Sequence, residues 1–156
     1  MGGAIVEGLV KGNYVENQDI CVSDPSHTAL QRFAEKVQNT TTDNRMAAKS
    51  SEVVFVVVKP WLVEKVIKDI KEVLDYDHQQ LIVVAAGITG EQLKTWLEKD
   101  GKVPATWLCI PNIAIAQLAS MTFLVPCNAI AQQQTEQVKK LLDSMGKTIV
   151  TQEKLL

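Results

Sequence analysis

The chain has 156 residues, a formal net charge of −2, and 46% hydrophobic and 22% charged residues. This length is enough for one domain with a buried core. The nearly neutral charge gives no sign of a surface for nucleic acid or membrane, so neither partner is expected. No stretch reaches the roughly 18 apolar residues that a membrane-spanning helix needs.

The start of the chain and its cysteines favour the cytoplasm. Met1-Gly2-Gly3-Ala4 has neither the basic flank nor the long apolar run of a signal peptide. Cys21, Cys109 and Cys127 are far apart, and each lies in or beside an apolar segment. We therefore expect reduced, buried thiols in a cytoplasmic protein, rather than a disulfide framework or a metal site.

The first third of the chain predicts short elements. A helix of small residues over 1–12 is expected to end at Gly12 as a cap. A short strand over 19–22 follows, and Ser26 or Thr28 can then cap a helix with an apolar face. The polar residues 40–44 predict a turn, after which Thr42 or Asp43 can cap a short helix.

Six consecutive apolar residues, five of them valine, occupy positions 53–58. β-Branched side chains suit a strand, and a run that is apolar on both faces predicts a strand buried on both sides. Lys59-Pro60 ends this strand, because proline lacks an N–H for the ladder and suits the first turn of a helix. We expect the other units to lie beside this strand.

The rest of the chain alternates helices and strands. Helices are predicted over residues 60–76, 91–99 (capped by Thr89) and 129–145 (with Gly146 after its end), and strands over 80–87, 104–110, 121–126 and 147–150. A short turn is predicted over 113–118. This alternation predicts the α/β class, with a mostly parallel sheet, right-handed crossovers and helices on both faces.

Candidate chemistry lies at the carboxyl ends of the predicted strands. No HExxH, CxxC, GxSxG or GxxxxGK[ST] motif is present, and we expect His27 and His78 to be exposed and without partners. Four short segments instead meet at one edge of a parallel sheet, the edge where ligands bind. These segments are residues 23–26, 57–60, 85–87 and 110–112.

In order and spacing, these segments resemble pyrroline-5-carboxylate reductase, a family that makes proline by hydride transfer from NAD(P)H to a cyclic imine. The resemblance covers essentially all 156 residues, but only the N-terminal, Rossmann-like domain of the family. It rests on Met1-Gly2-Gly3-Ala4-Ile5, Val22-Ser23-Asp24-Pro25-Ser26, Val58-Lys59-Pro60, Ala85-Ala86-Gly87-Ile88-Thr89, Pro111-Asn112, Ser120-Met121-Thr122 and Gly146-Lys147. The combination of the VKP-like and AAGIT-like segments is fairly specific.

The resemblance implies an oxidoreductase that reduces 1-pyrroline-5-carboxylate to proline, the last step of proline biosynthesis. It implies NADP or NAD as cofactor, a cyclic imino acid as small-molecule substrate, and no metal. One alternative is a related NADP-dependent reductase of the β-hydroxyacid dehydrogenase type. Another is a nucleotide-binding fragment without catalytic activity, since fold alone does not decide function.

The resemblance also implies that the Rossmann-like sheet is incomplete at the N-terminus. Complete family members begin with a strand and a GxGxMG turn, and this chain enters at the methionine, so Gly2 is the last glycine of the motif. Absence of a central strand leaves a gap. We therefore expect the chain to rearrange, to swap an element, or to self-associate by closing the gap against another copy.

A helical C-terminal domain follows in the family, where it forms the homo-oligomer and holds the loop that binds the imino acid. Residues 1–156 are therefore expected to be the NAD(P)-binding domain alone. We expect this fragment to be inactive by itself, and no catalytic residue is assigned within it.

The resemblance further implies a set of cofactor-binding residues by position. The set comprises Gly2 at the pyrophosphate; Ser23, Asp24 and Ser26 at the adenosine ribose; Asn44 on the adenosine side; Val57, Val58, Lys59 and Pro60 in the nucleotide cleft; Ala85, Ala86 and Gly87 at the nicotinamide end; and Asn112 at the substrate mouth. Three of these have structural alternatives: a solvated strand end for Lys59, a cap or turn for Asn44, and a loop hydrogen bond for Asn112.

Two features depart from the family pattern or leave a choice open. Ile113-Ala114 stands where the family commonly has Thr-Pro after Pro111-Asn112, which affects the shape of this loop. Asp24 can accept a hydrogen bond from a ribose 2′-hydroxyl, which favours NAD, and it would repel a 2′-phosphate unless serine hydroxyls or backbone N–H groups receive it. Many family members use NADP, so both cofactors remain open.

Overall fold

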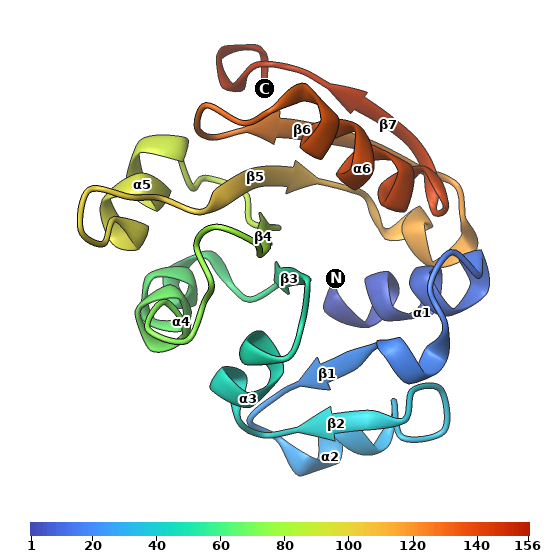
Figure 1. Cartoon of the computed structure of the whole chain (residues 1–156). Coiled ribbons are helices and arrows are strands. Elements are labelled where there is room, and N and C mark those ends of the chain that lie inside the picture. The colour runs from blue at the N-terminus through green and yellow to red at the C-terminus, as the bar shows by residue number, and fades with distance from the viewer.

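The structure is a computed structural model that describes residues 1–156. Its strands form two separate sheets, one with the order β1-β2 and one with the order β3-β4-β5-β6-β7 (Figure 1). The strands are β1 (Cys21–Ser23), β2 (Asn39–Thr41), β3 (Val53–Val56), β4 (Gln80–Val83), β5 (Ala105–Ile110), β6 (Ser120–Pro126) and β7 (Gly146–Val150). The α-helices are α1 (Gly2–Gly12), α2 (His27–Gln31), α3 (Asn44–Lys49), α4 (Val63–Ile70), α5 (Gly90–Leu97) and α6 (Gln132–Asp143).

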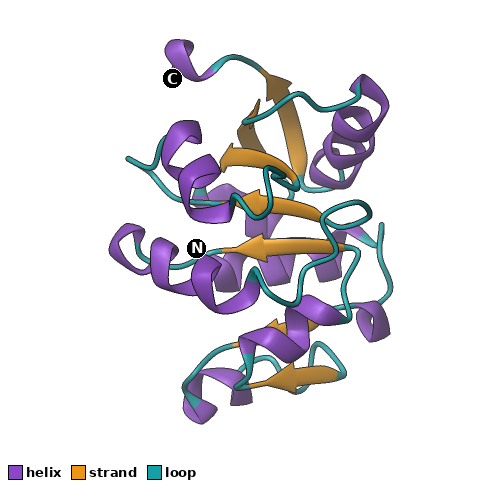
Figure 2. Ribbon diagram, turned by 60° about the vertical axis from the view of Figure 1, so that its left-hand side comes forward, coloured by secondary structure: helices purple, strands orange, loops and turns teal.

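The predicted α/β architecture is confirmed. β1 pairs with β2 in parallel, β3, β4 and β5 are parallel, β6 is antiparallel to β5, and β7 is parallel to β6. Helices cover both faces of the larger sheet (Figure 2). Alternation along β4 shows this directly, because Ile82 packs in the cluster with α1 and α6, whereas Leu81 and Val83 pack in the cluster with α4 and α5.

Side-chain caps mark the starts of three of the six α-helices. Ser26 accepts a hydrogen bond from the backbone N–H of Ala29 at the start of α2, and Asp43 accepts one at the start of α3. Thr89 forms a capping box with Gln92 at the start of α5. The prediction for the end of α1 is wrong: Gly12 is still helical, and Asn13 takes the left-handed conformation with φ of 54°.

The polar stretch predicted as a turn contains a strand. β2 forms because the backbone of Asn39–Thr41 pairs with β1, and the N–H of Asp24 extends this ladder to the carbonyl oxygen of Thr41 at 3.1 Å. The two threonines suit a strand, and the polar side chains are tolerated because β2 is an exposed edge.

β3 is an edge strand and not a fully buried one. Val53, Val54 and Phe55 are half-buried, whereas Ile82 on β4 and Trp107 on β5 are completely buried. The prediction of a strand buried on both sides is therefore wrong for β3. The reason is the expected gap in the sheet, which is present. β3 pairs only with β4, and its other edge faces the gap between the two sheets.

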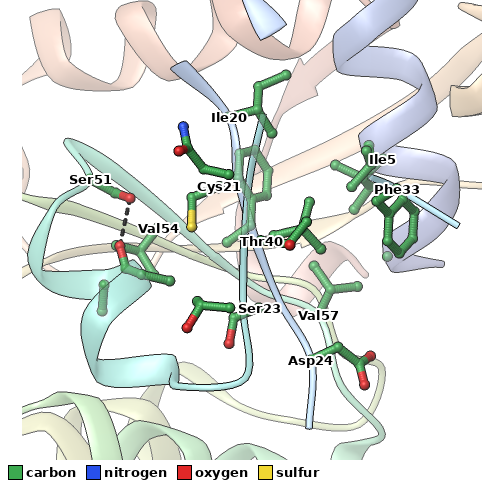
Figure 3. A pocket seen from close by; sticks show the side chains of 18 of the residues that line it. Ile5, Ile20, Cys21, Ser23, Asp24, Phe33, Thr40, Ser51, Val54 and Val57 are labelled. Atoms are coloured by element: carbon green, nitrogen blue, oxygen red, sulfur yellow. Dashed lines mark hydrogen bonds between the residues drawn. The ribbon is translucent and has the colours of Figure 1, made fainter. Parts of the chain in front are cut away.

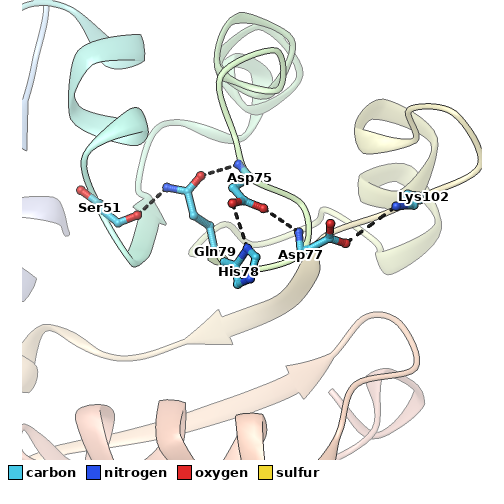
Figure 4. A network of polar contacts seen from close by, with 6 residues as sticks. All are labelled: Ser51, Asp75, Asp77, His78, Gln79 and Lys102. Atoms are coloured by element: carbon cyan, nitrogen blue, oxygen red, sulfur yellow. Dashed lines mark hydrogen bonds and ion pairs between the residues drawn. The ribbon is translucent and has the colours of Figure 1, made fainter.

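A buried glutamine, Gln79, connects the residues just before β3 with those just before β4. The side chain of Gln79 donates to the carbonyl oxygen of Ala48 at 2.6 Å. It also donates to the carbonyl oxygen of Ser51 and accepts from the N–H of Asp75 at 2.6 Å (Figure 4). His78 is exposed as predicted, but it has a partner, because its Nδ1 lies 2.9 Å from Oδ2 of Asp75. The hydrogen bond with His78, together with that from the N–H of Asp77, lowers the pKa of Asp75.

The three cysteines are free, as predicted. Cys109 and Cys127 are buried, and burial raises the pKa of each thiol to about 12. Cys21 is only half-buried, because it lies on β1 beside the gap, and this corrects the expectation of three buried thiols. No helix is both long and apolar enough to cross a membrane.

Candidate nucleotide-binding site

A cavity of about 1260 Å³ separates the two sheets. β1 and β3 line it from opposite sides, and residues of α1 and α3 also face it. Figure 3 shows Ser23, Asp24 and Val57 toward one end of this cavity and Ile20 toward the other. The polar end is therefore the carboxyl end of both strands, where open α/β sheets place ligands.

Six of the thirteen predicted cofactor-binding residues line this cavity. They are Gly2, Ser23, Asp24, Asn44, Val57 and Val58. Ser23 and Asn44 also contact each other, because the Ser23 hydroxyl donates to Oδ1 of Asn44 at 2.7 Å. This hydrogen bond joins the end of β1 to the start of α3, and it leaves the amide NH₂ of Asn44 as a donor for another group.

The turn after β1 holds Asp24 in a fixed position. Its Oδ1 accepts from the N–H of Ser26 at 2.9 Å, and its own N–H is bound to Thr41 of β2. Oδ2 of Asp24 makes no hydrogen bond within the protein, so it can accept one from a ligand hydroxyl. Ser26 is exposed, and its oxygen caps α2 by accepting from Ala29 at 3.2 Å, while its O–H remains a free donor.

The first turn of α1 lies beside the end of β3. A Cβ placed on Gly2 would be 3.8 Å from Cβ of Val57, so the helix begins at the carboxyl end of the sheet. Met1 makes no side-chain capping hydrogen bond there. The first N–H groups of a helix have no helical acceptor, and together with the helix dipole they favour an anionic group such as a pyrophosphate.

The remaining predicted residues lie outside the cavity. Lys59 is exposed and precedes the 3₁₀ turn that Pro60 begins, and its side chain makes no capping hydrogen bond. Ala85 is buried, whereas Ala86 and Gly87 are exposed after β4. Gly87 has a φ of +79°, and no atom lies within 4 Å of the position that a Cβ would occupy, so there is room for a flat group beside its backbone.

Asn112 has a structural role of its own. Its side chain accepts from the N–H of Ala114 at 3.0 Å, and its N–H donates to the hydroxyl of Ser120 at 3.3 Å. The loop hydrogen bond considered for this residue is therefore present. Since the bond to Ala114 uses the amide oxygen, the NH₂ group of Asn112 remains available as a donor.

One contact at this edge of the sheet was missed by sequence reasoning. The carboxylate of Glu153 accepts from the N–H of Gly90, at 3.0 Å and 3.2 Å from its two oxygens, at the start of α5. This places the end of the chain next to the loop that contains Gly87. No local signal could have revealed it, because the partners are 63 residues apart.

Comparisons with known proteins agree with this architecture. The model of the family described as NADP oxidoreductase, coenzyme F420-dependent, matches residues 1–88. The pyrroline-5-carboxylate reductase of Pasteurella multocida (strain Pm70) is 33% identical over 158 residues, which cover 98% of this chain and 56% of that protein.

Solved structures are similar over nearly the whole chain. The structure of a pyrroline-5-carboxylate reductase from Coxiella burnetii matches with a TM-score of 0.86 at 28% identity, over 97% of this chain and 55% of that one. The structure of Plasmodium falciparum pyrroline carboxylate reductase with NADP bound also has a TM-score of 0.86, over 99% of this chain and 55% of that one. At 18% identity, the latter likeness shows the fold alone.

The chain spans about half the length of the relatives it matches. Within that half, the match to the family model begins at residue 1 and includes β1, β3 and β4, the strands that carry most of the candidate residues. The chain therefore belongs to the NADP oxidoreductase, coenzyme F420-dependent, family, and its resemblance to pyrroline-5-carboxylate reductase is confirmed.

Proposed function

We propose that this chain is the NADP-binding half of a reductase that converts 1-pyrroline-5-carboxylate to proline. The observation that carries the proposal is the 33% identity to the Pasteurella multocida reductase over 98% of this chain. The agreement in fold with the Coxiella burnetii enzyme, with a TM-score of 0.86, supports it. The free, largely buried cysteines support a cytoplasmic location for this enzyme.

The role proposed for the chain is to bind and orient the dinucleotide. The cofactor supplies a hydride from C4 of its nicotinamide ring, so the protein contributes position and electrostatics. The free N–H groups at the start of α1, near Gly2, suit the pyrophosphate, and the open backbone at Gly87 suits the flat nicotinamide ring. Val57 and Val58 supply apolar surface in the cavity beside the start of α1.

The remaining candidates are proposed to surround the same cofactor. Ala85 and Ala86 adjoin the nicotinamide end, Lys59 and Pro60 the outer rim of the cleft, and Asn112 the mouth through which a cyclic imino acid enters. Ser23 acts indirectly, by holding Asn44 through the 2.7 Å hydrogen bond. The substrate contacts themselves are assigned to the part of the enzyme beyond this half, which also forms the proposed homo-oligomer.

Recognition of a 2′-phosphate must overcome the charge of Asp24. Two donors near this carboxylate are available for the task, the hydroxyl of Ser26 and the amide NH₂ of Asn44, because neither makes a hydrogen bond to the protein through these hydrogens. We place the 2′-phosphate of NADP on these two groups. Oδ2 of Asp24 then accepts from the neighbouring 3′-hydroxyl of the ribose.

Calorimetric titration with NADPH and then NADH tests this assignment. We expect a dissociation constant in the micromolar range, about −8 kcal/mol, for NADPH. Asp24→Asn should strengthen NADPH binding by about tenfold by removing a like charge, and Asn44→Ala should weaken it by about tenfold. Asp69→Asn, an exposed change on α4, is the matched control and should leave both titrations unchanged. If neither NADPH nor NADH binds, the proposal is contradicted.

The reaction itself requires a longer protein, because the chain spans about half of its relatives. We would join this chain to the part of the Pasteurella multocida reductase that follows its matching segment. Oxidation of NADPH that depends on added 1-pyrroline-5-carboxylate is the expected result. A chimera that binds NADPH and shows no such oxidation would refute the substrate while keeping the cofactor.

A further inference from the structure

The loop between β4 and α5 forms backbone hydrogen bonds only at its two ends. This loop, residues 84–89, is here called the β4–α5 loop, and Gly87 lies in it. At its first end, the N–H of Val84 donates to the carbonyl oxygen of Val56 at 2.9 Å. The N–H and C=O groups of residues 85–88 have no backbone hydrogen-bond partner. The position of Gly87 therefore depends strongly on what holds the second end of the loop.

The second end of the loop is held by one local and one distant contact. Locally, Thr89 and Gln92 form the capping box of α5, in which the N–H of Gln92 donates to the Thr89 hydroxyl at 3.1 Å. This capping box does not reach the N–H of Gly90, which is the first residue of α5. That N–H donates to the carboxylate of Glu153, whose two oxygens lie 3.0 Å and 3.2 Å away. Glu153 thus anchors the loop to a distant part of the chain.

Gly90 provides the space that the carboxylate occupies. A Cβ on Gly90 would lie 2.9 Å from Oε2 of Glu153, a distance shorter than van der Waals contact, whereas Cβ of Cys127 would be 3.7 Å away. A larger residue at position 90 would therefore push the carboxylate aside. The partial positive charge at the start of α5 also favours a negative group here. Gly90 and Glu153 thus fit each other in both shape and charge.

The side chain of Glu153 has Gly90 as its only hydrogen-bond partner. It takes part in none of the ion pairs of the structure. Its backbone is tied to the larger sheet, because the N–H of Thr151 donates to the carbonyl oxygen of Leu124 on β6 at 3.0 Å. Glu153 is therefore a link between the outer strands of this sheet and the β4–α5 loop.

We propose that Glu153 is a positioning residue for the nicotinamide ring of the cofactor. It acts through Gly90, because the hydrogen bond between them fixes the second end of the β4–α5 loop. The open backbone at Gly87, on which the ring lies, is thereby held in place. This inference rests on the proposed function, which supplies the position of the ring. It goes further by giving a role to a residue in the segment after β7, outside the set of candidate cofactor-binding residues.

Loss of this link would affect the cofactor only where the cofactor meets the loop. Without the anchor, residues 85–88 would sample more conformations, and binding would have to order them at a cost in entropy. The nicotinamide ring needs this ordering, whereas the adenosine end of the cofactor, at Asp24 and Asn44, does not. Binding of NADPH should therefore respond to changes at Glu153. Binding of 2′,5′-ADP, which carries the 2′-phosphate and lacks nicotinamide, should not.

Calorimetric titration of the whole chain with both ligands tests the proposal. We expect Glu153→Ala to weaken NADPH binding by about fivefold, with the affinity for 2′,5′-ADP unchanged. Glu153→Gln keeps one acceptor oxygen without the charge, so it should recover part of this loss. Glu136→Ala, which changes an exposed glutamate on α6, is the matched control and should leave both titrations unchanged. Amide hydrogen exchange at Gly90 should be about tenfold faster in Glu153→Ala, because that N–H loses its acceptor.

A change at Gly90 tests the same link from its other side. Gly90→Ala leaves Glu153 in the chain, but its added methyl group displaces the carboxylate. Alanine favours a helix more than glycine does, so α5 should still form, and circular dichroism checks that the variant folds. We expect the same selective loss of NADPH affinity as in Glu153→Ala. The double variant should bind NADPH no more weakly than either single variant, because both changes break one contact.

The contrary results are distinguishable from one another. If the unmodified chain binds neither NADPH nor 2′,5′-ADP, the proposed function fails, and this inference fails with it. If the unmodified chain binds both ligands and Glu153→Ala weakens both equally, Glu153 has a general structural role, and the inference alone is overturned. An NADPH affinity that is unchanged in Glu153→Ala overturns the inference as well, as does an additive loss in the double variant.

Discussion

The strands on the two sides of the cavity have very different surroundings. In the five-stranded sheet, β4 and β5 have neighbours on both edges and helices on both faces, and Ile82, Trp107 and Leu108 are almost fully buried. In the two-stranded sheet, every residue of β1 is half-buried and β2 is largely exposed. The degree of burial thus follows from the number of neighbours that a strand has, and only secondarily from how apolar it is.

The largest expected effect is a difference in stability between a substitution on an inner strand and one on an edge strand. Trp107 is completely buried, and its Nε1 donates to the hydroxyl of Thr135 at 3.1 Å. Trp107→Ala should lower the free energy of unfolding by about 3–5 kcal/mol. Phe55→Ala on half-buried β3 should cost about 1–2 kcal/mol, because the residue lines the cavity and is already partly exposed. Urea denaturation measures both, and equal costs would break the comparison.

A second test concerns the outer edge of the larger sheet. Gly146 begins β7 with a φ of +141°, and a Cβ there would lie 2.2 Å from the carbonyl oxygen of Ser120. Gly146→Ala should therefore destabilise the protein by about 2–4 kcal/mol. Gly101→Ala is the matched control, since Gly101 also has a positive φ but no atom near its Cβ position, and it should cost about 1 kcal/mol.

Thiol reactivity sharpens the same contrast between regions. Cys21 lies half-buried on β1 beside the cavity, and burial raises its pKa, whereas fuller burial raises the pKa of Cys109 and of Cys127 to about 12. At pH 8 we expect Cys21 to react with a thiol reagent at least about tenfold faster than the other two. One reactive thiol in the folded protein and three in denaturant would confirm this. Equal rates would mean that the larger sheet opens as readily as β1.

The smallest expected effect on stability concerns Asp143, which joins the end of α6 to β7. Partial burial by itself would raise the pKa of Asp143, but hydrogen bonds from Lys139 at 2.6 Å and from the N–H of Thr148 at 3.0 Å outweigh it and lower the pKa. A lowered pKa means that this stabilisation is present above the usual value of 3.8 and is lost as the pH falls through the folded-state value.

Asp143→Asn should accordingly lower the melting temperature by about 2 °C or less at pH 7, because the pair is exposed. The difference from the unmodified chain should shrink below about pH 4 and vanish in stronger acid. Asp69→Asn serves as control, and a difference that persists at pH 2 would contradict the role given to the carboxylate.

Local chemistry made much of this fold predictable from sequence. Caps at Ser26, Asp43 and Thr89 marked helix starts, and the alternation of apolar strands with helices gave the α/β class and the sheet. What failed depended on partners that are distant in sequence. β2 needed its pairing with β1 to be recognised as a strand, and the exposure of β3 depended on the cavity beside it.

The candidate site divides in the same way. The resemblance selected residues at strand ends, and six of them do line one cavity. The hydrogen bond between Ser23 and Asn44, and the anchoring of Glu153 on Gly90, join residues 21 and 63 positions apart, so no local pattern contains them. Which donors remain free for a ligand is likewise a property of the folded arrangement.

The strand order of the larger sheet has a consequence for how quickly it can fold. From β3 to β7, each strand pairs with the strand that precedes it in the chain, and Val53 lies only 27 residues before its partner Gln80. Pairings of such short range keep contact order low, which favours rapid folding for a parallel sheet. By the same reasoning, we expect α1 to dock later than the sheet forms, because its Gly8 packs against the carbonyl of Ile115, more than 100 residues away.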